Sequence, residues 1–446
     1  MRFSKAQSTS ATQTTRPALN RRRFVQASVT ALSMAPFFGV YGCMSNPVLR
    51  NNTRQLIPDP EGILDLPSGL KYTVLDRNGN TLSDGSVSPG RPDGMGCFMA
   101  EDGKLVLMRN HEISPQHHGT SAGRGAYKLS KVPDNAYSDT DLGGVSRLVV
   151  NPENLQVEHS NMVLSGTRNN CAGGITPFGW LSCEESIDND FFEKHGFVFL
   201  CDTDADTLQP PKRIDAYGRF KHEAAGYDPD TGRCYLTEDI SSSCLYRFLP
   251  DNAASPFEGK LQALRVVGED TFEASLMTSG ESKLIDWVDV PDSQAGSDVS
   301  KDSQALGAAV FVRGEGCWFD NGLLVFTATE GGPREKGQIF QVEDKDDGAT
   351  LTLLSQSDAE TDLFHPDNIT ISPTGDIYFA EDNSGKCLIQ RLSPDGSLTT
   401  IAGNQEEGEE IAGLCFSPDG SILFGNIQKP GITFACLLYT SPSPRD

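Results

Sequence analysis

The chain has 446 residues and carries 61 acidic against 37 basic residues, which gives a formal net charge of −24. This balance argues against a nucleic acid or an anionic membrane as a partner held by general electrostatics. The length would suit two or three ordinary domains, but repeat folds of this size also form one body.

Residues 1–43 have the pattern of an export signal. The basic run Arg21-Arg22-Arg23-Phe24-Val25 precedes a weakly apolar stretch from Ala27 to Tyr41, which is the form of a twin-arginine signal. That stretch is too short and too polar for a stable membrane span. Val40-Tyr41-Gly42-Cys43 also resembles a lipoprotein cleavage box, so a lipid anchor at Cys43 stays open. We expect the twin-arginine machinery to deliver the protein to the periplasm, the extracellular space or the cell surface.

Residues 44–60 are predicted to form a polar linker, and 61–433 a single domain. Within that domain, short runs rich in Val, Ile, Leu, Phe and Tyr alternate with Asp-Gly, Pro-Asp-Gly and Pro-Thr-Gly turns, which predicts β-hairpins. Helical periodicity is scarce, and the candidates for short inserted helices are 182–195 and 268–290. Residues 434–446 do not resemble a closing strand, and we interpret them as a truncated or non-native tail.

A hairpin pattern recurs six times, with a polar or acidic residue at most of its ends. The first and last residues of an antiparallel hairpin lie side by side opposite the turn. The intervals between copies match a four-stranded blade, with insertions in some copies, and therefore predict an all-β fold, a six-bladed β-propeller. A solenoid is the structural alternative. The six copies are Asp93–Glu112, Cys171–Glu185, Glu223–Asp239, Glu315–Glu330, Asp367–Asp382 and Gly413–Asn426.

In a propeller, the ends of these hairpins meet at one mouth of the central channel. So many carboxylates around one axis would repel each other unless cations neutralised them. Carboxylate and amide oxygens suit Ca²⁺, whereas a lone thiolate favours a softer transition metal. The sequence therefore predicts a mixed metal cluster. The residues expected at this mouth are Asp93, Asn110, Glu112, Cys171, Glu184, Glu185, Glu223, Glu238, Asp239, Glu315, Asp367, Asn368, Glu381 and Asp382.

Two arginines add positive charge beside this acidic mouth. Arg313 stands two residues before Glu315, and Arg168 stands three before Cys171. An arginine fork beside metals suits a phosphate oxyanion, and the alternative is that each arginine only balances the charge of its neighbours. His111 and His222 adjoin predicted ligands and would either orient a carboxylate or bind metal themselves.

Several motifs, in order along the chain, resemble the PhoX family of bacterial alkaline phosphatases, and the match runs from about Leu66 to Thr433. They are Asp93-Gly94-Met95, Arg109-Asn110-His111-Glu112, Gly166-Thr167-Arg168-Asn169-Asn170-Cys171, Cys183-Glu184-Glu185, His222-Glu223-Ala224, Thr237-Glu238-Asp239, Arg313-Gly314-Glu315-Gly316, Asp367-Asn368 and Asn426-Ile427-Gln428.

The resemblance implies a propeller that carries Fe³⁺ and Ca²⁺ and hydrolyses phosphate monoesters outside the cytoplasm. By this analogy Cys171, Glu223 and Glu315 would hold iron. The other predicted metal ligands would serve mainly calcium: Asp93, Glu112, Glu184, Glu185, Glu238, Asp239, Asp367, Asn368 and Glu381. We predict Arg313, Arg168 and Glu315 as catalytic residues, with Arg313 clamping the phosphate, and we expect a monomer.

Two other functional classes stay open. One is a calcium-binding propeller without turnover, and the other is a different propeller hydrolase of the lactonase or phytase type. The chain is shorter than the larger phosphatases that it resembles, which leaves its substrate range open.

Overall fold

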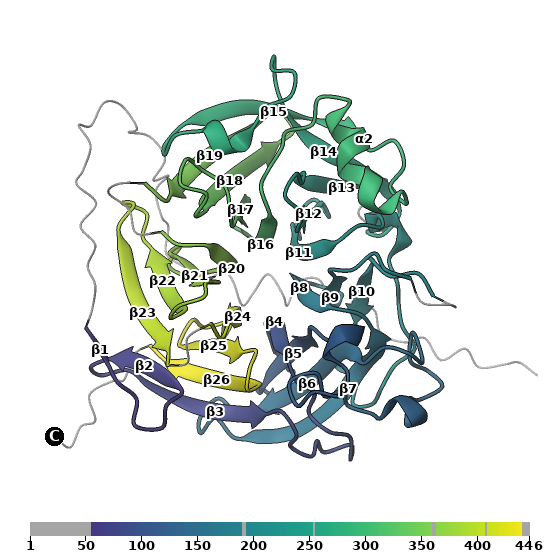
Figure 1. Cartoon of the computed structure of the whole chain (residues 1–446), viewed down its shortest axis with the longest axis vertical. Coiled ribbons are helices and arrows are strands. Elements are labelled where there is room, and N and C mark those ends of the chain that lie inside the picture. The colour runs from purple at the N-terminus through teal and green to yellow at the C-terminus, as the bar shows by residue number, and fades with distance from the viewer. Residues whose placement is uncertain (1–54, 190–192, 253–254, 359–362, 406–407, 439–446) are drawn as a thin grey trace, which may run out of the picture. The chain divides into compact units, whose positions relative to one another are not determined.

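The computed structural model describes residues 55–189, 193–252, 255–358, 363–405 and 408–438 (Figure 1). These residues belong to one compact unit that runs from Leu49 to Asp446. The predicted export signal, the lipidation site at Cys43 and most of the 44–60 linker lie outside the described residues. In the part of the chain that is described, no helix combines the length and apolar composition needed to cross a bilayer.

The described residues form an all-β, propeller-like arrangement of sheets around a common centre (Figure 1). Hydrogen bonding joins their strands into five sheets, and one of these has nine strands. That sheet is continuous because β15 (Ser282–Asp289) pairs with both β14 (Gly259–Val266) and β19 (Gly348–Gln356). The all-β prediction is confirmed, and the hydrogen-bonded sheets number five where six blades were expected.

Three sheets follow one another between residues 92 and 356. The first holds β4 (Pro92–Met99), β5 (Leu105–His111), β6 (Gly143–Val150) and β7 (Val157–Thr167), and the second holds β8 (Asn170–Thr176), β9 (Gly179–Glu184) and β10 (Val198–Cys201). The nine-stranded sheet adds to β14, β15 and β19 the strands β11 (His222–Tyr227), β12 (Cys234–Glu238), β13 (Tyr246–Pro250), β16 (Gly314–Asp320), β17 (Leu323–Ala328) and β18 (Gln338–Lys345).

The last two sheets combine strands from both ends of the described chain. One contains β20 (Pro366–Ile371), β21 (Ile377–Glu381), β22 (Leu388–Leu392), β23 (Leu398–Asn404), β2 (Leu64–Pro67) and β1 (Leu56–Ile57). The other contains β24 (Ile411–Phe416), β25 (Ile422–Ile427), β26 (Ile432–Leu437) and β3 (Lys71–Arg77). The antiparallel pair of β26 with β3 closes the circle of sheets.

This closure corrects both expected domain boundaries. Phe434 and Cys436 are buried in β26, where they pair with Val74 and Tyr72, so the fold extends past 433. The run from Phe434 to Leu437 is apolar and β-forming, and it supplies the strand that covers β3. Residues 439–446 lie outside the described residues. At the other end, β1 falls inside the segment expected to be a linker.

The hairpins follow from turn chemistry. For example, Asn321 and Gly322 join β16 to β17 with φ of 49° and 82°, and the flanking Asp320 and Leu323 are paired. Positive φ at both central residues is the geometry of a two-residue hairpin that matches the strand twist.

The described helical segments are short, and they fall outside the expected stretches except for η4. The stretch 268–290 holds mainly β15, because its apolar residues pair across the nine-stranded sheet, and the described part of 182–195 is helix-free. The helical segments are α2 (Val299–Gln304), η1 (Pro115–His117), η2 (Leu129–Lys131), η3 (Asp215–Tyr217), η4 (Ala274–Leu276) and η5 (Gly296–Asp298).

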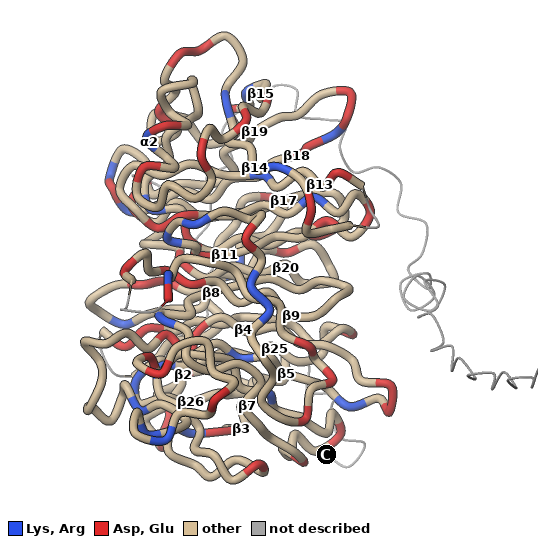
Figure 2. The backbone as a smooth tube through the Cα atoms, turned by 90° about the vertical axis from the view of Figure 1, so that its right-hand side faces the viewer, with Lys and Arg blue, Asp and Glu red and all other residues tan. Residues whose placement is uncertain are grey.

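The hydrophobic core lies between successive sheets. Cys183 and Val198 of the second sheet, for instance, pack in one buried cluster with Ala225 and Leu236 of the nine-stranded sheet. Acidic positions are spread over all the sheets (Figure 2). The net charge therefore does not by itself locate a site.

Six inner hairpins surround the centre, and each has the same β-bulge. Their first strands, β4, β8, β11, β16, β20 and β24, are neighbours in that cyclic order, with β24 beside β4. In each hairpin two residues at the start of the first strand oppose one residue of the second. Such a bulge bends the strand and re-aims a side chain. The first bulge residues are Asp93, Cys171, Glu223, Glu315, Asp367 and Gly413.

Candidate metal centre

Five of the six first bulge residues are potential metal ligands, and they converge. Three groups of ligand-type side chains form around them, in each of which one ligand atom per residue lies within 4.8 Å of the others. The groups are Cys171 with Glu185 and Glu223, then Glu223 with Glu315 and Asp367, and finally Asp93 with Glu112 and Glu410.

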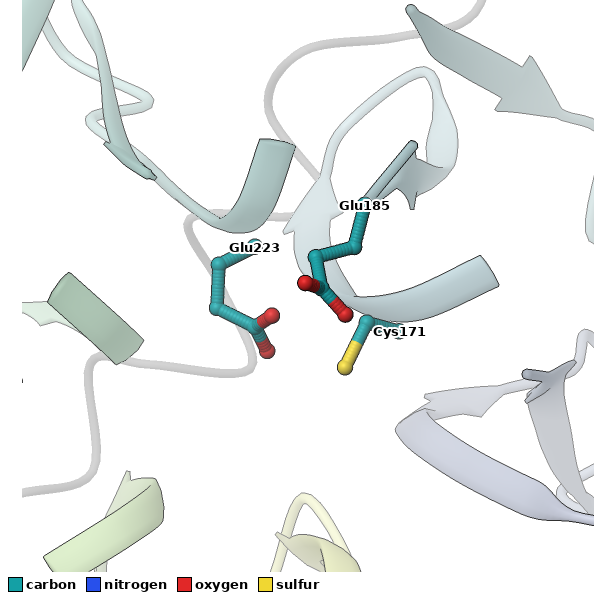
Figure 3. Close-up of side chains that lie close together, drawn as sticks. All are labelled: Cys171, Glu185 and Glu223. Atoms are coloured by element: carbon teal, nitrogen blue, oxygen red, sulfur yellow. The ribbon is translucent and has the colours of Figure 1, made fainter. Parts of the chain in front are cut away.

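The first group combines one thiol with two carboxylates. Figure 3 shows the sulfur of Cys171 and the carboxylates of Glu185 and Glu223 turned toward the same space. Cys171 comes from β8, Glu223 from β11, and Glu185 directly follows β9. Sulfur together with carboxylate oxygen suits a transition metal better than calcium.

Glu223 also belongs to the second group, with Glu315 and Asp367. Its Oε2 atom is buried and has no hydrogen-bond partner among the described residues. A buried carboxylate oxygen without a partner is costly, whereas a cation beside it would satisfy it. The shared carboxylate therefore fits a pair of neighbouring metal ions.

The third group lies where the sixth hairpin meets the first. Gln428 donates hydrogen bonds to the carboxylates of both Asp93 and Glu112, and Arg91 forms an ion pair with Glu112. Glu410 completes the group, although sequence reasoning missed it. The sixth hairpin has glycine at its first bulge position, and the acid stands three residues earlier. The pair Glu409-Glu410 directly before the strand was the available signal.

Hydrogen bonds between successive hairpins hold the ligand residues in place. Asn110 donates to the carbonyl of Cys171 at 3.0 Å, and Thr327 donates to that of Asp367 at 2.9 Å. In the same way, Thr237 donates to the carbonyl of Glu315, and Asn426 to that of Asp93. Asn110, Thr237 and Thr327 lie opposite a bulge, and Asn426 pairs with the residue directly before one. Each thus fixes the ligand-bearing backbone of a neighbouring hairpin.

The electrostatics of the groups favour bound cations. Burial, followed by repulsion from Glu112, raises the pKa of Asp93 to about 7, and burial with repulsion from Asp239 raises the pKa of Glu185 to about 8. Burial also raises the pKa of the Cys171 thiol. Without cations these groups would hold protons near neutral pH, so the donor set fits metal ions that replace the protons. The same causes raise the pKa well above its usual range in Glu223, Glu315, Asp367 and Glu410.

Arg313 lies beside the second group. Its guanidinium forms two hydrogen bonds with Asp239, at 2.9 and 3.1 Å, and one with Glu315 at 2.5 Å. Although burial opposes it, the negative charge of Glu315 and Asp239 raises the pKa of Arg313. The side chain is 27% exposed, and its Nη1 atom lies 3.5 Å from the carboxylate of Glu330, which is itself 45% exposed.

Arg168, in contrast, is engaged in a separate buried network, which supports the charge-balancing alternative. Its guanidinium donates two hydrogen bonds to Asp141, at 2.8 and 3.0 Å. Asp141 also pairs with His195, which contacts Glu184 at 2.7 Å. Burial alone would lower the pKa of His195, but its hydrogen bonds to Asp141 and Glu184 raise it to about 9.

Five predicted metal ligands lie outside the groups, namely Glu184, Glu238, Glu381, Asp239 and Asn368. The first three do so because side chains alternate along a strand. Glu184 accepts hydrogen bonds from His195 and from the backbone of Gly196, Glu238 accepts one from Tyr246 at 2.7 Å, and Glu381 accepts one from Gln390 at 3.3 Å. In the strand register, each of these glutamates lies opposite the residue directly before the bulge of its own hairpin, and its side chain points away from the centre. The next residues along these strands are Glu185, Asp239 and Asp382.

Three further polar residues make structural contacts. Asn368, predicted as a ligand, accepts a hydrogen bond from the backbone of Leu414 at 2.7 Å. His111 contacts Gly90 and Ser146, and His222 contacts Gly218. Burial lowers the pKa of both histidines to about 3, so each ring is neutral. None of these histidine contacts involves a carboxylate of the three ligand groups.

Comparison with known protein families identifies the family of this chain. Residues 51–161 and 151–431 match the family described as alkaline phosphatase PhoX. The chain belongs to this family. It is thus an alkaline phosphatase-like phosphoric monoester hydrolase, and PhoX enzymes are metal-dependent, exported phosphatases. A search of curated proteins gave no match.

Among solved structures, the chain is similar to Pseudomonas fluorescens PhoX in complex with vanadate, a transition state analogue. The two share 17% identity with a TM-score of 0.67 over 88% of this chain and 98% of that one, which supports a common fold. A Xanthomonas campestris gluconolactonase matches with 11% identity and a TM-score of 0.42, over 82% of this chain and 97% of the other. Virginiamycin B lyase from Staphylococcus aureus matches with 13% identity and a TM-score of 0.40, over 83% and 100%.

Proposed function

We propose that this PhoX-family protein is an exported phosphatase that hydrolyses phosphate monoesters at a cluster of Fe³⁺ and Ca²⁺ ions. The observation that carries the proposal is the pair of ligand groups that share Glu223, one of which contains the thiol of Cys171 and the other of which adjoins Arg313. The vanadate bound to the Pseudomonas fluorescens relative mimics a transferring phosphoryl group, which is consistent with this chemistry.

We assign iron to Cys171, Glu223 and Glu315, with Glu185 and Asp367 beside them, and calcium to Asp93, Glu112 and Glu410. When bound, such metals polarise phosphoryl oxygens and lower the pKa of a coordinated water, which supplies a nucleophile without a serine.

The residues of the chain itself bind and orient the substrate. The Arg313 fork matches two oxygens of a phosphate group, because guanidinium presents parallel N–H donors. Its hydrogen bonds with Asp239 fix the direction of that fork. A rigid donor that faces the developing negative charge stabilises the transition state more than the substrate.

We also propose that the nine-stranded sheet comprises two blades. Strands β11–β14 and β16–β19 are each consecutive in sequence and antiparallel, and β15 bridges the two sets. The six inner strands in cyclic order support this interpretation. A six-bladed propeller would then describe the domain.

Export by the twin-arginine route would deliver a folded and metal-loaded protein. All ten cysteines among the described residues are free thiols, and nine of them are buried. A domain that needs no disulfide suits a pathway that carries folded chains. A lipid anchor at Cys43 remains the alternative to a released form.

Hydrolysis of p-nitrophenyl phosphate at alkaline pH by protein loaded with iron and calcium tests the proposal. We expect turnover by the wild type, iron and calcium in elemental analysis, and loss of both iron and activity in Cys171→Ala. Calcium without iron and without turnover would favour a non-catalytic calcium-binding propeller, and full activity in Cys171→Ala would contradict the site.

A further inference from the structure

A second ring of side chains lies next to the ligand residues in the sequence. In four of the six inner hairpins, a basic residue stands two positions before the acidic first bulge residue. Three of the four have positive φ, between 43° and 54°, so the backbone turns sharply just before the strand. The four residues are Arg91, Lys221, Arg313 and His365.

Three of these four residues have a clear assignment. The guanidinium of Arg91 binds both the carboxylate and the backbone carbonyl of Glu112, and only 11% of the Arg91 side chain is exposed. Arg313 is the proposed phosphate clamp. His365 packs against Phe364 with ring centroids 4.7 Å apart, and a histidine ring is mostly neutral at the alkaline pH of the assay.

Lys221 is less tightly held than the two arginines. Its side chain is 39% exposed, and its Nζ atom contacts Glu185 Oε1 at 3.4 Å, longer than a good charged hydrogen bond. A partly exposed pair of this kind contributes little to stability. A cation held by Glu185 would weaken this attraction and let the ammonium group meet another anion.

Lys221 and Arg313 lie at two ligand groups that are joined to each other. Lys221 touches a member of the first ligand group, Arg313 touches a member of the second, and the two groups share Glu223. Asp239 interacts with both basic side chains, since it forms an ion pair with Arg313 and its negative charge raises the pKa of Lys221. The two cations therefore stand at the two groups that the shared carboxylate joins.

We propose that Lys221 is a second phosphate-binding residue, which contacts a phosphoryl oxygen of the substrate held by Arg313 and favours dianionic monoesters over monoanionic diesters. The inference rests on the proposed phosphatase function. Two cations beside the ester match a charge of minus two, because each added charge strengthens attraction in a partly desolvated site.

The test compares Lys221→Met with Lys221→Arg in metal-loaded protein. A control, Lys260→Met, removes another partly exposed ion pair, that of Lys260 with Asp289 at 2.9 Å on the outer strands. For Lys221→Met we expect the KM for p-nitrophenyl phosphate and the inhibition constant of inorganic phosphate to rise about tenfold. Hydrolysis of bis-p-nitrophenyl phosphate should change less. Lys221→Arg should recover most of the affinity, and Lys260→Met should behave as the wild type.

Unchanged KM and unchanged inhibition by phosphate in Lys221→Met would overturn the inference while the phosphatase function stands. A lower metal content with an unchanged KM would also overturn it, because Lys221 would then serve the metal site instead of the substrate. If metal-loaded wild type hydrolyses no monoester, the proposed function itself fails. Equilibrium binding of inorganic phosphate then decides on Lys221: weaker binding by Lys221→Met supports its role, and equal binding refutes it.

Discussion

At the scale of single residues, the two predicted phosphate-binding arginines differ in what surrounds them. Arg168 is buried and paired with Asp141 and, through it, with His195. Arg313 is partly exposed and lies against ligand residues. Sequence proximity to a predicted ligand is similar in the two cases, but the Arg313 side chain is 27% exposed and that of Arg168 only 8%.

This contrast predicts that substitution by methionine lowers mainly stability at Arg168 and mainly activity at Arg313. Arg168→Met leaves Asp141 as a buried charge without its main partner and should lower the free energy of unfolding by about 3 kcal/mol. Arg313→Met should change stability less but lower kcat/KM for p-nitrophenyl phosphate on the order of a hundredfold.

Urea unfolding and steady-state kinetics on both variants, each checked for metal content, measure these effects. If Arg168→Met unfolds like the wild type but loses activity as severely as Arg313→Met, the structural role of Arg168 is wrong.

At the scale of elements, the β-bulge is the feature that turns a potential ligand toward the centre in five of the six inner hairpins. The second bulge residue must allow the next hairpin to approach. A Cβ added at Gly94 would lie 2.4 Å from the Cα of Ala172 and 2.8 Å from the carbonyl oxygen of Cys171. Glycine at this position therefore lets β4 contact the backbone that carries the thiol ligand.

Gly94→Ala should therefore displace β8 from β4. We expect a loss of about 1–3 kcal/mol in stability and a lower iron content, because Cys171 moves with its strand. Gly385→Ala is the matched control, since its added Cβ would meet only the Asn383 side chain, at 3.1 Å. Thermal unfolding and elemental analysis read out the effect. A Gly94→Ala protein with normal iron would show that the close approach of the strands is not needed for the site.

At the scale of the whole molecule, the ligand groups join hairpins that are far apart in sequence. Glu223, Glu315 and Asp367 come from three consecutive inner hairpins, and Asp93 meets Glu410 across the closure of the circle. Cations at these groups would hold neighbouring hairpins together. In their absence, the same carboxylates must take up protons or repel one another.

Removal of metal should therefore make stability pH-dependent with a defined sign. The pKa of Glu185 rises from 4.5 to about 8 in the folded state, and a raised acid pKa means that the folded protein binds more protons than the unfolded chain. Stability of the metal-free protein is then greatest near pH 4.5 and falls as the pH rises toward 8. The stability of the metal-loaded protein should depend less on pH, and near pH 8 it should melt roughly 10 °C higher than the metal-free protein.

Calorimetric scans of loaded and chelator-treated protein between pH 5 and 8 measure this dependence. A metal-free protein that becomes more stable as the pH rises would show that the buried carboxylates are not the groups that couple metal to folding.

The sequence by itself determined the strands, the recurring hairpins and the types of side chain that gather at the centre, because turn residues, strand patterns and the excess of acids at hairpin ends are local signals. It located Cys171, Glu223, Glu315 and Asp367 at equivalent positions, and all four lie in the ligand groups.

Only the tertiary structure decided which of two adjacent acids faces the centre. Glu184 and Glu185 are neighbours in sequence, but a shift of one residue in a strand reverses the side to which a side chain points. Likewise, Glu410 joins its group only because the last sheet meets the first, and Arg168 is neutralised by Asp141, which is distant in sequence. Strand register, bulge position and long-range pairing depend on the packing of the whole circle of sheets, and no local stretch of sequence contains them.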